Sequence, residues 1–375
     1  MTGRRVLFYV QHLLGIGHLA RASRVASALA ADGFDVTVVT GGTPVAGFPA
    51  PGVAHVALPA LTSRDEGFSC LVTATGEPAG KAFEAMRRDR LLEVFHALAP
   101  DILVIEAFPF GRRQMRFELL PLLDAAVKAE PRPRIVTSIR DILQKRTKPG
   151  RNEETVDTLN RYFDLVLVHG DPAFVRLEET FPLTGAIRPP VAYTGLVAPE
   201  PPVPSQERFD IVVSAGGGAA GRDLVTAAVD AANRLVQNLR WLLITGPNLA
   251  GEAFAAAASG APANMAVERF RTNFAGLLAS ARLSVSQAGY NTVCDVLRAG
   301  CRSVLVPFAA SGETEQTMRA ERLARLGLAV VLPERGIGGE ALAAAIGAAL
   351  ATPPPSRAAL ALDGAQRSAA ILKAL

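Results

Sequence analysis

The sequence predicts two α/β domains in succession, each built on a parallel sheet with helices on both of its faces. Apolar runs of strand length alternate with amphipathic stretches of helical period along most of the 375 residues. The alternation stops once, at the proline-rich segment Val197–Gln206, and then starts again. Each half opens with a strand, a glycine-rich turn and a helix. Because crossovers between parallel strands are right-handed, each half is expected to be a doubly wound domain.

The first half places short apolar runs between stretches of helical period, which predicts a parallel sheet buried on both faces. The expected strands are Val6–Val10, Val36–Thr40, Val53–Leu58, Asp101–Glu106, Arg134–Ile139 and Leu165–His169. The expected helices are Leu19–Ala31, Lys81–Leu98 and one that starts near Asn152.

The segment Val197–Gln206 contains four prolines, and proline sustains neither a helix nor a central strand. We therefore expect a first domain over residues 1–197, a linker over 198–206 and a second domain over 207–375. A long surface loop within one domain is the alternative interpretation.

The second half repeats the alternation of strands and helices. Its expected strands are Asp210–Ser214, Trp241–Thr245, Ala266–Phe270, Leu283–Ser286, Ser303–Pro307 and Ala329–Leu332. One helix is expected from about Arg222, and the Ala- and Leu-rich stretch Ser356–Leu375 is expected to be a final helix, which can pack back on the first domain.

Composition and charge narrow the class of protein. Hydrophobic residues make up 49% of the chain and charged residues 20%, which favours large buried cores over disorder. The net charge is +4, and the densest basic run, Arg140–Lys148, is short and interrupted, so we expect no nucleic-acid partner. A solvated loop is the simplest interpretation of this run. Attraction to anionic substrates or to an anionic membrane surface is the alternative.

The cysteines and the apolar runs bear on location. Cys70, Cys294 and Cys301 form neither a disulfide framework nor a metal-ligand pattern, and reduced thiols suit the cytoplasm. No apolar run has the length that crosses a bilayer, and the first one is too short for a signal peptide. We expect a cytoplasmic protein, with peripheral contact at the inner face of the membrane left open.

The first glycine-rich turn contains Gly15, Gly17 and His18 and follows the first strand. This position is the carboxyl edge of a parallel sheet, where ligands bind, and the glycines let the backbone approach a donor substrate. His18 is of the right type to accept a proton near neutral pH. The alternative is that His18 only caps the helix. Ala20 occupies the third glycine position of a dinucleotide fingerprint, which is therefore absent.

Glu106 ends the strand Asp101–Glu106 and is expected at the same edge of the sheet. It is a second candidate for the catalytic base, and a strand-end ion pair is the alternative. Arg112, Arg113 and Arg140 follow strands nearby and are candidates to bind a phosphate or carboxylate on an acceptor.

The second glycine-rich turn opens the second domain. Consecutive glycines between a strand and a helix can place several backbone N–H groups around a diphosphate, and a flexible tight turn is the alternative. The candidate donor-binding residues of this turn are Gly216, Gly217, Gly218, Gly221 and Arg222.

Further donor-binding candidates follow later strands. Asn291 is expected to cap a helix, with Thr292 in its first turn beside a phosphate and Asp295 one turn further on, where it can accept the ribose hydroxyls. Ordinary placement of carboxylates near a helix N-terminus is the alternative for the acidic residues. The remaining candidates are Phe270 and Gly289, with Glu315 and Gln316 proposed for the sugar hydroxyls.

The two glycine-rich turns, the run from Ala288 to Asp295, the Val-Pro-Phe strand end and the Glu315–Ala320 segment together resemble glycosyltransferase family 28, whose best-known type is the MurG N-acetylglucosaminyltransferase. The resemblance covers both halves, and the second half carries most of its specificity. It implies the GT-B fold, with two Rossmann-like domains facing across a cleft, and no catalytic metal. Asp295 stands where the family usually has Glu. Glu315-Gln316 stands for its Gln-Gln pair, and Arg319 for its Asn.

The resemblance implies a metal-independent glycosyltransferase with no cofactor, which inverts the sugar as it moves it from a nucleotide diphosphate sugar. UDP-N-acetylglucosamine is the default donor. The acceptor is left open between a lipid-linked molecule and a small metabolite; the apolar pairs Leu13-Leu14 and Phe108 with Phe110 are candidate contacts, with core packing as their alternative. The alternative functions are a nucleotide-sugar hydrolase or 2-epimerase, and a non-catalytic nucleotide-sugar-binding subunit.

Overall fold

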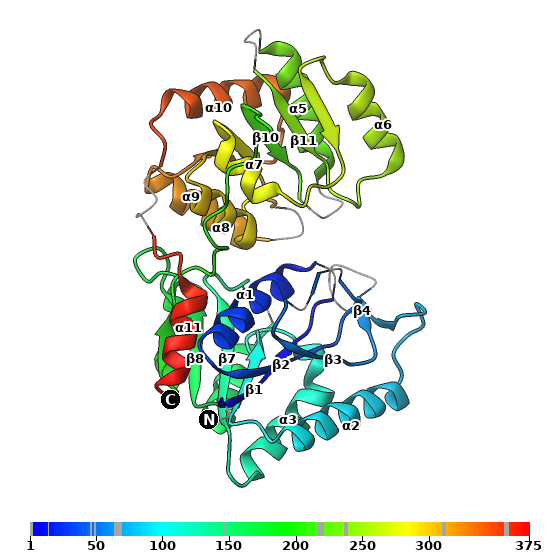
Figure 1. Ribbon diagram of the computed structural model, residues 1–375, viewed down its shortest axis with the longest axis vertical. Coiled ribbons are helices and arrows are strands. Elements are labelled where there is room, and N and C mark those ends of the chain that lie inside the picture. Colours follow the sequence, from blue (N-terminus) through cyan, green and yellow to red (C-terminus); the bar gives the residue numbers. More distant parts are fainter. Residues whose placement is uncertain are drawn as a thin grey trace. The chain divides into compact units, whose positions relative to one another are not determined.

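A computed structural model describes residues 3–13, 15–45, 47–48, 50–63, 70–145, 148–216, 221–235, 239–309, 313–355 and 360–375. The chain divides into two compact units (Figure 1). The first unit contains Met1–Val197 together with Ala361–Leu375, and the second contains Ala198–Leu360. None of the described helices is both long enough and apolar enough to cross a membrane.

The first unit is built on a parallel sheet in the order β3-β2-β1-β6-β7-β8-β9. Its strands are β1 (Arg5–Val10), β2 (Asp35–Thr40), β3 (Ala54–Ala57), β6 (Ile102–Glu106), β7 (Arg134–Arg140), β8 (Leu165–His169) and β9 (Val191–Tyr193). Its helices are α1 (Gly17–Ala31), α2 (Lys81–Leu98), α3 (Arg116–Lys128), α4 (Arg151–Tyr162) and α11 (Gly364–Lys373). The expected strands of this half all lie within or overlap these elements.

The side chains of β1 show how this sheet is covered. Leu7 and Tyr9 point into a core shared with α2, α3 and α4, whereas Phe8 and Val10 point into a core shared with α1 and α11. This alternation follows from the two-residue period of a strand. Both faces are buried, which explains why β1 reads as a continuous apolar run.

The second unit is built on a parallel sheet in the order β12-β11-β10-β13-β14-β15. Its strands are β10 (Ile211–Ser214), β11 (Trp241–Ile244), β12 (Met265–Glu268), β13 (Leu283–Ser286), β14 (Arg302–Leu305) and β15 (Val330–Val331). Its helices are α5 (Arg222–Arg234), α6 (Gly251–Gly260), α7 (Phe274–Ser280), α8 (Tyr290–Ala299), α9 (Glu315–Arg325) and α10 (Gly339–Ala351). One core joins the sheet to α5 and α10, and the other joins it to α7 and α8.

The end of the chain differs from the sequence prediction. A helix was expected over Ser356–Leu375, but α11 begins only at Gly364, and residues 356–359 lie outside the described part. Before this helix, Ala361 accepts a hydrogen bond from the Leu196 amide at 2.8 Å, and Asp363 forms an isolated β-bridge with Val197. The helix belongs to the first unit, where it packs beside α1.

The proline-rich segment 198–206 belongs to the second unit. The amide of Ser205 donates to the Gly276 carbonyl at 2.9 Å, and the Ser280 hydroxyl donates to the Ser205 carbonyl at 2.9 Å. The backbone around Ser205 is therefore attached to α7.

A short antiparallel hairpin of β4 (Leu61–Ser63) and β5 (Leu71–Thr73) follows β3 and was not predicted. Strands of three residues are too short to show a two-residue period in the sequence.

Each sheet has a point at which the order of its strands reverses. In the first unit it lies between β1 and β6, and in the second unit it lies between β10 and β13. Doubly wound sheets bind ligands beyond the carboxyl ends of the strands at such points.

Candidate active site

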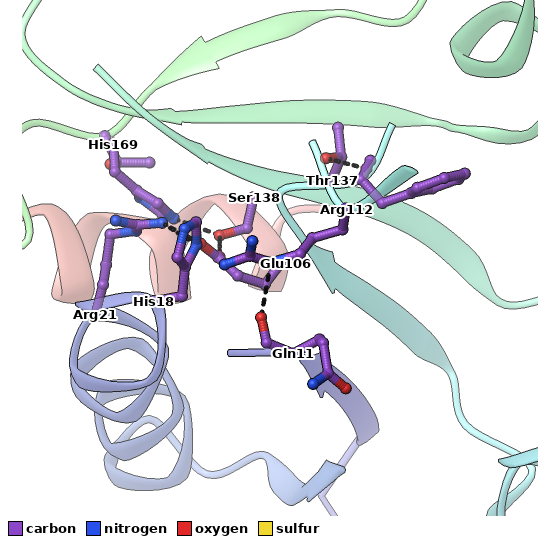
Figure 2. A network of polar contacts seen from close by, with 10 residues as sticks. Gln11, His18, Arg21, Glu106, Arg112, Thr137, Ser138 and His169 are labelled. Carbon is purple, nitrogen blue, oxygen red and sulfur yellow. Dashed lines mark hydrogen bonds and ion pairs between the residues drawn. The ribbon is translucent and has the colours of Figure 1, made fainter. Parts of the chain in front are cut away.

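The reversal point of the first unit brings His18 and Glu106 together. Glu106 is the last residue of β6, and His18 lies in the first turn of α1, which follows β1. The Nδ1 atom of His18 lies 3.1 Å from Glu106 Oε1. Figure 2 shows the two side chains meeting between α1 and the sheet. The structure thus pairs the two residues that the sequence offered as alternative bases.

Glu106 is buried, with 1% of its surface exposed, and both of its oxygens have partners. Arg21, one turn after His18 on α1, forms an ion pair with Oε1. Ser138, opposite Glu106 on β7, donates its hydroxyl hydrogen to Oε2 at 2.6 Å. The carboxylate is held from two sides of the sheet edge.

The electrostatics of the pair favour an anionic Glu106 and a neutral His18 at neutral pH. Burial raises the pKa of Glu106, but the Arg21 charge and the His18 hydrogen bond outweigh it and hold this pKa well below its usual range. Burial, followed by the Arg112 charge, lowers the pKa of His18 to about 3. Both oxygens of the Glu106 anion already have partners, whereas the neutral imidazole of His18 has a lone pair available.

The arrangement leaves one nitrogen of His18 away from the carboxylate. A carboxylate only accepts hydrogen bonds, so the 3.1 Å contact with Glu106 favours a proton on Nδ1 over the longer 3.4 Å approach of Arg21 Nη2, which can only donate. The lone pair of the neutral ring is then on Nε2, and the side chain retains 21% of its exposed surface. This is the arrangement of an oriented general base.

The arginine candidates Arg112 and Arg113 have different partners in the structure. Arg112 donates from Nε to the Gln11 carbonyl at 2.8 Å, and Figure 2 shows it beside Glu106. Burial and the nearby Arg140 charge lower the pKa of Arg112 to about 10, although Glu106 opposes this shift. Arg113 instead forms an ion pair with Glu154 of α4. Arg113 is therefore engaged in an ion pair away from this site.

The apolar candidates near this edge are mostly core residues. Leu13, Phe108 and Phe110 are buried, and the ring of Phe110 packs edge-on against Phe181 at 5.1 Å. Leu14 lies outside the described residues. The packing interpretation applies to Leu13 and the two phenylalanines. In the first turn, Gly15 is exposed and Gly17 is half-buried.

The reversal point of the second unit begins at the turn after β10. Gly216 has a φ of +81°, and a Cβ atom there would lie 2.8 Å from Gln287 Oε1, at the end of β13. Gly221 is the residue before α5, and a Cβ atom there would lie 2.7 Å from the Ala215 carbonyl oxygen. Arg222 is exposed at the first position of α5, and Gly217 and Gly218 lie outside the described residues.

Helix α8 begins at the same edge, directly after β13. Its cap residue is Gly289, so the expectation that Asn291 caps the helix was wrong. Asn291 instead lies in the first turn, together with Thr292, which was expected there. The first N–H groups of a helix have no acceptor within the helix. Asp295 is four residues after Asn291 and so lies on the same face of the helix. The helix starts early because the extended Gly289 directly precedes it.

Glu315 and Gln316, the two residues expected to bind the donor sugar, have different surroundings in the structure. Glu315 is 4% exposed, and its Oε1 accepts a hydrogen bond from Arg319 Nη2 at 2.7 Å. Arg319 also donates to the Ala288 carbonyl at 2.9 Å, which joins α9 to the start of α8. Gln316 is half-buried and accepts a hydrogen bond from the Phe308 amide at 3.2 Å. Phe270, after β12, is 66% exposed.

Comparison with known protein families decides what the second unit is. Residues 211–370 match the model of the glycosyltransferase family 28 C-terminal domain. The second unit is therefore similar to the C-terminal domain of glycosyltransferase family 28. The reversal point described above lies within the matched residues.

Among curated proteins, this chain is similar to UDP-N-acetylglucosamine–N-acetylmuramyl-(pentapeptide) pyrophosphoryl-undecaprenol N-acetylglucosamine transferases. It is 37% identical over 129 residues to that of Xanthomonas campestris pv. campestris (strain B100), which covers 34% of this chain and 30% of the relative. It is 27% identical over 164 residues to that of Thermotoga neapolitana, which covers 43% of this chain and 46% of the relative. The similarity thus spans less than half the length of each relative.

Solved structures extend the likeness of fold to both units. The calicheamicin glycosyltransferase CalG4 has a TM-score of 0.63 at 19% identity, covering 99% of this chain and 95% of that one. MurG of Acinetobacter baumannii has a TM-score of 0.59 at 18% identity, covering 98% and 95%. The glycosyltransferase VinC, solved in complex with DTDP, has a TM-score of 0.63 at 16% identity, covering 98% and 96%. The chain therefore has the GT-B fold, with two Rossmann-like domains.

Sequence reasoning missed several polar residues of the first site. Arg21 was read only as part of the first helix, although it lies three residues after His18 and hence on the same helix face. Ser138 and His169 lie at or near the ends of the predicted strands Arg134–Ile139 and Leu165–His169. The signal that singled out Glu106, a polar residue at the carboxyl end of a buried strand, applies equally to His169.

Proposed function

We propose that this protein is a metal-independent glycosyltransferase that moves a hexosyl or N-acetylhexosaminyl group from a nucleotide diphosphate sugar to an acceptor hydroxyl. The observation that carries the proposal is the His18–Glu106 pair at the reversal point of one unit, in a chain whose other unit matches the family 28 domain. By their names, the curated relatives transfer N-acetylglucosamine from its UDP derivative. We therefore propose UDP-N-acetylglucosamine as the first donor to test.

His18 is the proposed base, and Glu106 orients it. The acceptor oxygen attacks the anomeric carbon, the bond from that carbon to the diphosphate oxygen breaks, and the hydroxyl proton passes to Nε2 of His18. Direct displacement of this kind inverts the anomeric configuration. The imidazolium that forms is stabilised by the Glu106 carboxylate 3.1 Å from Nδ1. Buried and ion-paired with Arg21, Glu106 is well suited to this supporting role.

The second unit is proposed to bind the nucleotide. Helices α5 and α8 both begin at its reversal point, and their N-termini can stabilise the negative diphosphate. The turn at Gly216–Gly218 and Thr292 contribute to the phosphate site in this proposal, and Asp295 accepts hydrogen bonds from the ribose hydroxyls. Gln316 is the better candidate for the donor sugar, because Glu315 is buried against Arg319.

The acceptor is proposed to carry a negatively charged group. Arg112 lies beside Glu106, and Arg140, the last residue of β7, is close enough for its charge to lower the pKa of Arg112. Two guanidinium groups can bind a phosphate or a carboxylate with paired hydrogen bonds. A diphosphate-linked lipid, of the kind in the names of the curated relatives, and a small anionic metabolite both satisfy this requirement.

Thermal unfolding in the presence of nucleotides tests the donor site. Trp241, the single tryptophan of the chain, is buried in the second unit, so its fluorescence follows the unit proposed to bind the donor. UDP, thymidine diphosphate and their sugar conjugates, added without metal, are the probes. A ligand that binds only the folded state raises the Tm according to its concentration relative to its Kd.

We expect one nucleoside diphosphate and its sugars to raise the Tm, and Asp295→Ala to weaken this binding about tenfold, as expected for lost hydrogen bonds to a charged group. Glu321→Ala, which removes an exposed carboxylate from α9, is the matched control and should leave binding unchanged. No Tm increase with any of these nucleotides would contradict the donor-site proposal.

A further inference from the structure

A line of buried polar side chains extends from Glu106 into the sheet. Ser138 Oγ lies 2.6 Å from Glu106 Oε2 and 2.8 Å from His169 Nε2, and His169 Nδ1 lies 2.9 Å from Thr194 Oγ1. The four residues belong to adjacent strands of the sheet: Glu106 and His169 end β6 and β8, Ser138 lies two residues before the end of β7, and Thr194 directly follows β9. None is more than 1% exposed. Figure 2 shows Ser138 between Glu106 and His169.

Counting protons fixes the direction of each hydrogen bond in this line. Glu106 is an anion and only accepts, so the single hydroxyl hydrogen of Ser138 is donated to it. Ser138 must then accept from His169, which places the ring proton of His169 on Nε2. Burial, followed by the Arg21 charge, lowers the pKa of His169 to about 3, so the ring has one proton and its Nδ1 accepts from Thr194.

We propose that Ser138 and His169 are positioning residues, which act through Glu106 to hold His18 in the tautomer needed for catalysis. The proposal rests on the function proposed above, in which His18 is the base. In this arrangement the Ser138 and His169 hydrogens both point toward Glu106, and reversing either of these two hydrogen bonds would remove the Ser138 donor from Glu106 Oε2. Ser138 therefore fixes Oε2 of the carboxylate, which directs Oε1 to His18 and Arg21.

The Glu106 carboxylate needs the Ser138 hydrogen bond because the terminal side-chain torsion of a glutamate rotates easily. The terminal torsion of glutamate is broad, so rotamer preference alone does not hold its plane. Arg21 contacts Oε1, the same atom that faces His18, and its Nη2 also lies 3.4 Å from His18 Nδ1. Without the Ser138 hydroxyl, rotation would allow Arg21 to draw Glu106 away from the Nδ1 proton of His18.

Histidine tautomers can be observed directly by NMR of the full chain labelled with ¹⁵N-histidine. The chain has five histidines, and His18→Gln and His169→Gln variants assign the two signals of interest. We expect the proton on Nδ1 in His18 and on Nε2 in His169. The charged groups that face these rings are Glu106 and Arg21, with Arg112 also acting on His18. A wild-type His169 with its proton on Nδ1 would overturn the proposal.

Removing the hydroxyl of Ser138 gives the more specific result. In Ser138→Ala, the Nε2 proton of His169 loses its acceptor, so we expect it to move to Nδ1 and be donated to Thr194. Thr194 can then donate to the Gly195 carbonyl, 2.9 Å away. Tyr162→Phe is the matched control, because it removes a buried hydroxyl bonded to Asp124 at 2.7 Å in the same unit. It should leave both tautomers unchanged.

An unchanged His169 tautomer in Ser138→Ala would also overturn the proposal. Where turnover is measurable, Ser138→Ala and His169→Phe are each expected to lower kcat about tenfold with little change in KM. His169→Gln, which keeps an N–H donor for Ser138, should recover most of the loss. The NMR result needs no turnover, so a failure of the hydrogen-bonded line can be told apart from a failure of the proposed glycosyl transfer.

Discussion

Glu106 and His18 were equal candidates for the base in the sequence, and their surroundings distinguish them. Glu106 is buried and shares its oxygens among Arg21, Ser138 and His18, whereas His18 keeps part of its surface exposed. The distinction depends on burial and on partners far apart in the chain. Residue type and position at a strand end therefore predict which residues belong to the site, but they do not predict which of them takes the proton.

The same limit applies to the donor-site candidates. The run from Gly289 to Asp295 could be placed at a helix start from the sequence, because a strand and a glycine precede it. The partner of Glu315 could not, since the Arg319 side chain reaches both Glu315 and the Ala288 carbonyl only once α9 packs beside α8. The departures from the family pattern at 315 and 319 thus form one buried ion pair.

At the scale of elements, the long apolar strands and the central helices could be predicted because burial on both faces leaves a strong pattern. The elements that were missed or misplaced depend on other segments. The β4–β5 hairpin has strands of three residues, and α11 starts late because residues 361–363 hydrogen-bond with residues 195–197. Neither the pairing of these short strands nor the contact between residues 361–363 and 195–197 can be predicted from the local sequence.

The turn between β10 and α5 gives a prediction at this scale. Gly216→Ala should lower the stability of the second unit by about 1–2 kcal/mol, because the Cβ atom of alanine clashes with the backbone at a positive φ. Gly289→Ala is the control at the same edge, since Gly289 has a φ of −64° and open space around its Cβ position. Chemical unfolding followed by Trp241 fluorescence measures both variants. Equal stability of the two variants would contradict the assigned backbone conformation.

At the scale of the whole molecule, the two units should respond differently to acid. All five histidines lie in the first unit. The pKa of His18 and of His169 is lowered by burial to about 3, so the unfolded chain binds their protons more readily. The contribution of these two neutral histidines to the unfolding free energy of the first unit is complete above about pH 6.5. It is lost as the pH falls toward 3. Glu106, whose pKa is also lowered, adds to this loss only below about pH 4.5.

We therefore expect the unfolding free energy of the first unit to fall between pH 6.5 and 4.5, by up to about 1.4 kcal/mol per pH unit for each of these two histidines. Circular dichroism follows both units during denaturation, and Trp241 fluorescence follows the second unit, which lacks histidine. His169→Gln should reduce the slope of the first transition. A first unit with the same stability at pH 6.5 and pH 5 would show that these histidines are not buried in neutral form.

The most direct test of the account is release of nucleoside diphosphate from the nucleotide sugar that binds, measured with and without acceptors. The acceptor panel contains an undecaprenyl-diphosphate-linked muramyl substrate, as in the names of the curated relatives, and small anionic metabolites with free hydroxyls. We predict release that requires an acceptor, a fall of at least about 100-fold in His18→Ala, as for loss of a general base, and unchanged nucleotide binding. Release at the wild-type rate in His18→Ala, or equal release without any acceptor, would contradict the assignment of His18 as the base of a glycosyl transfer.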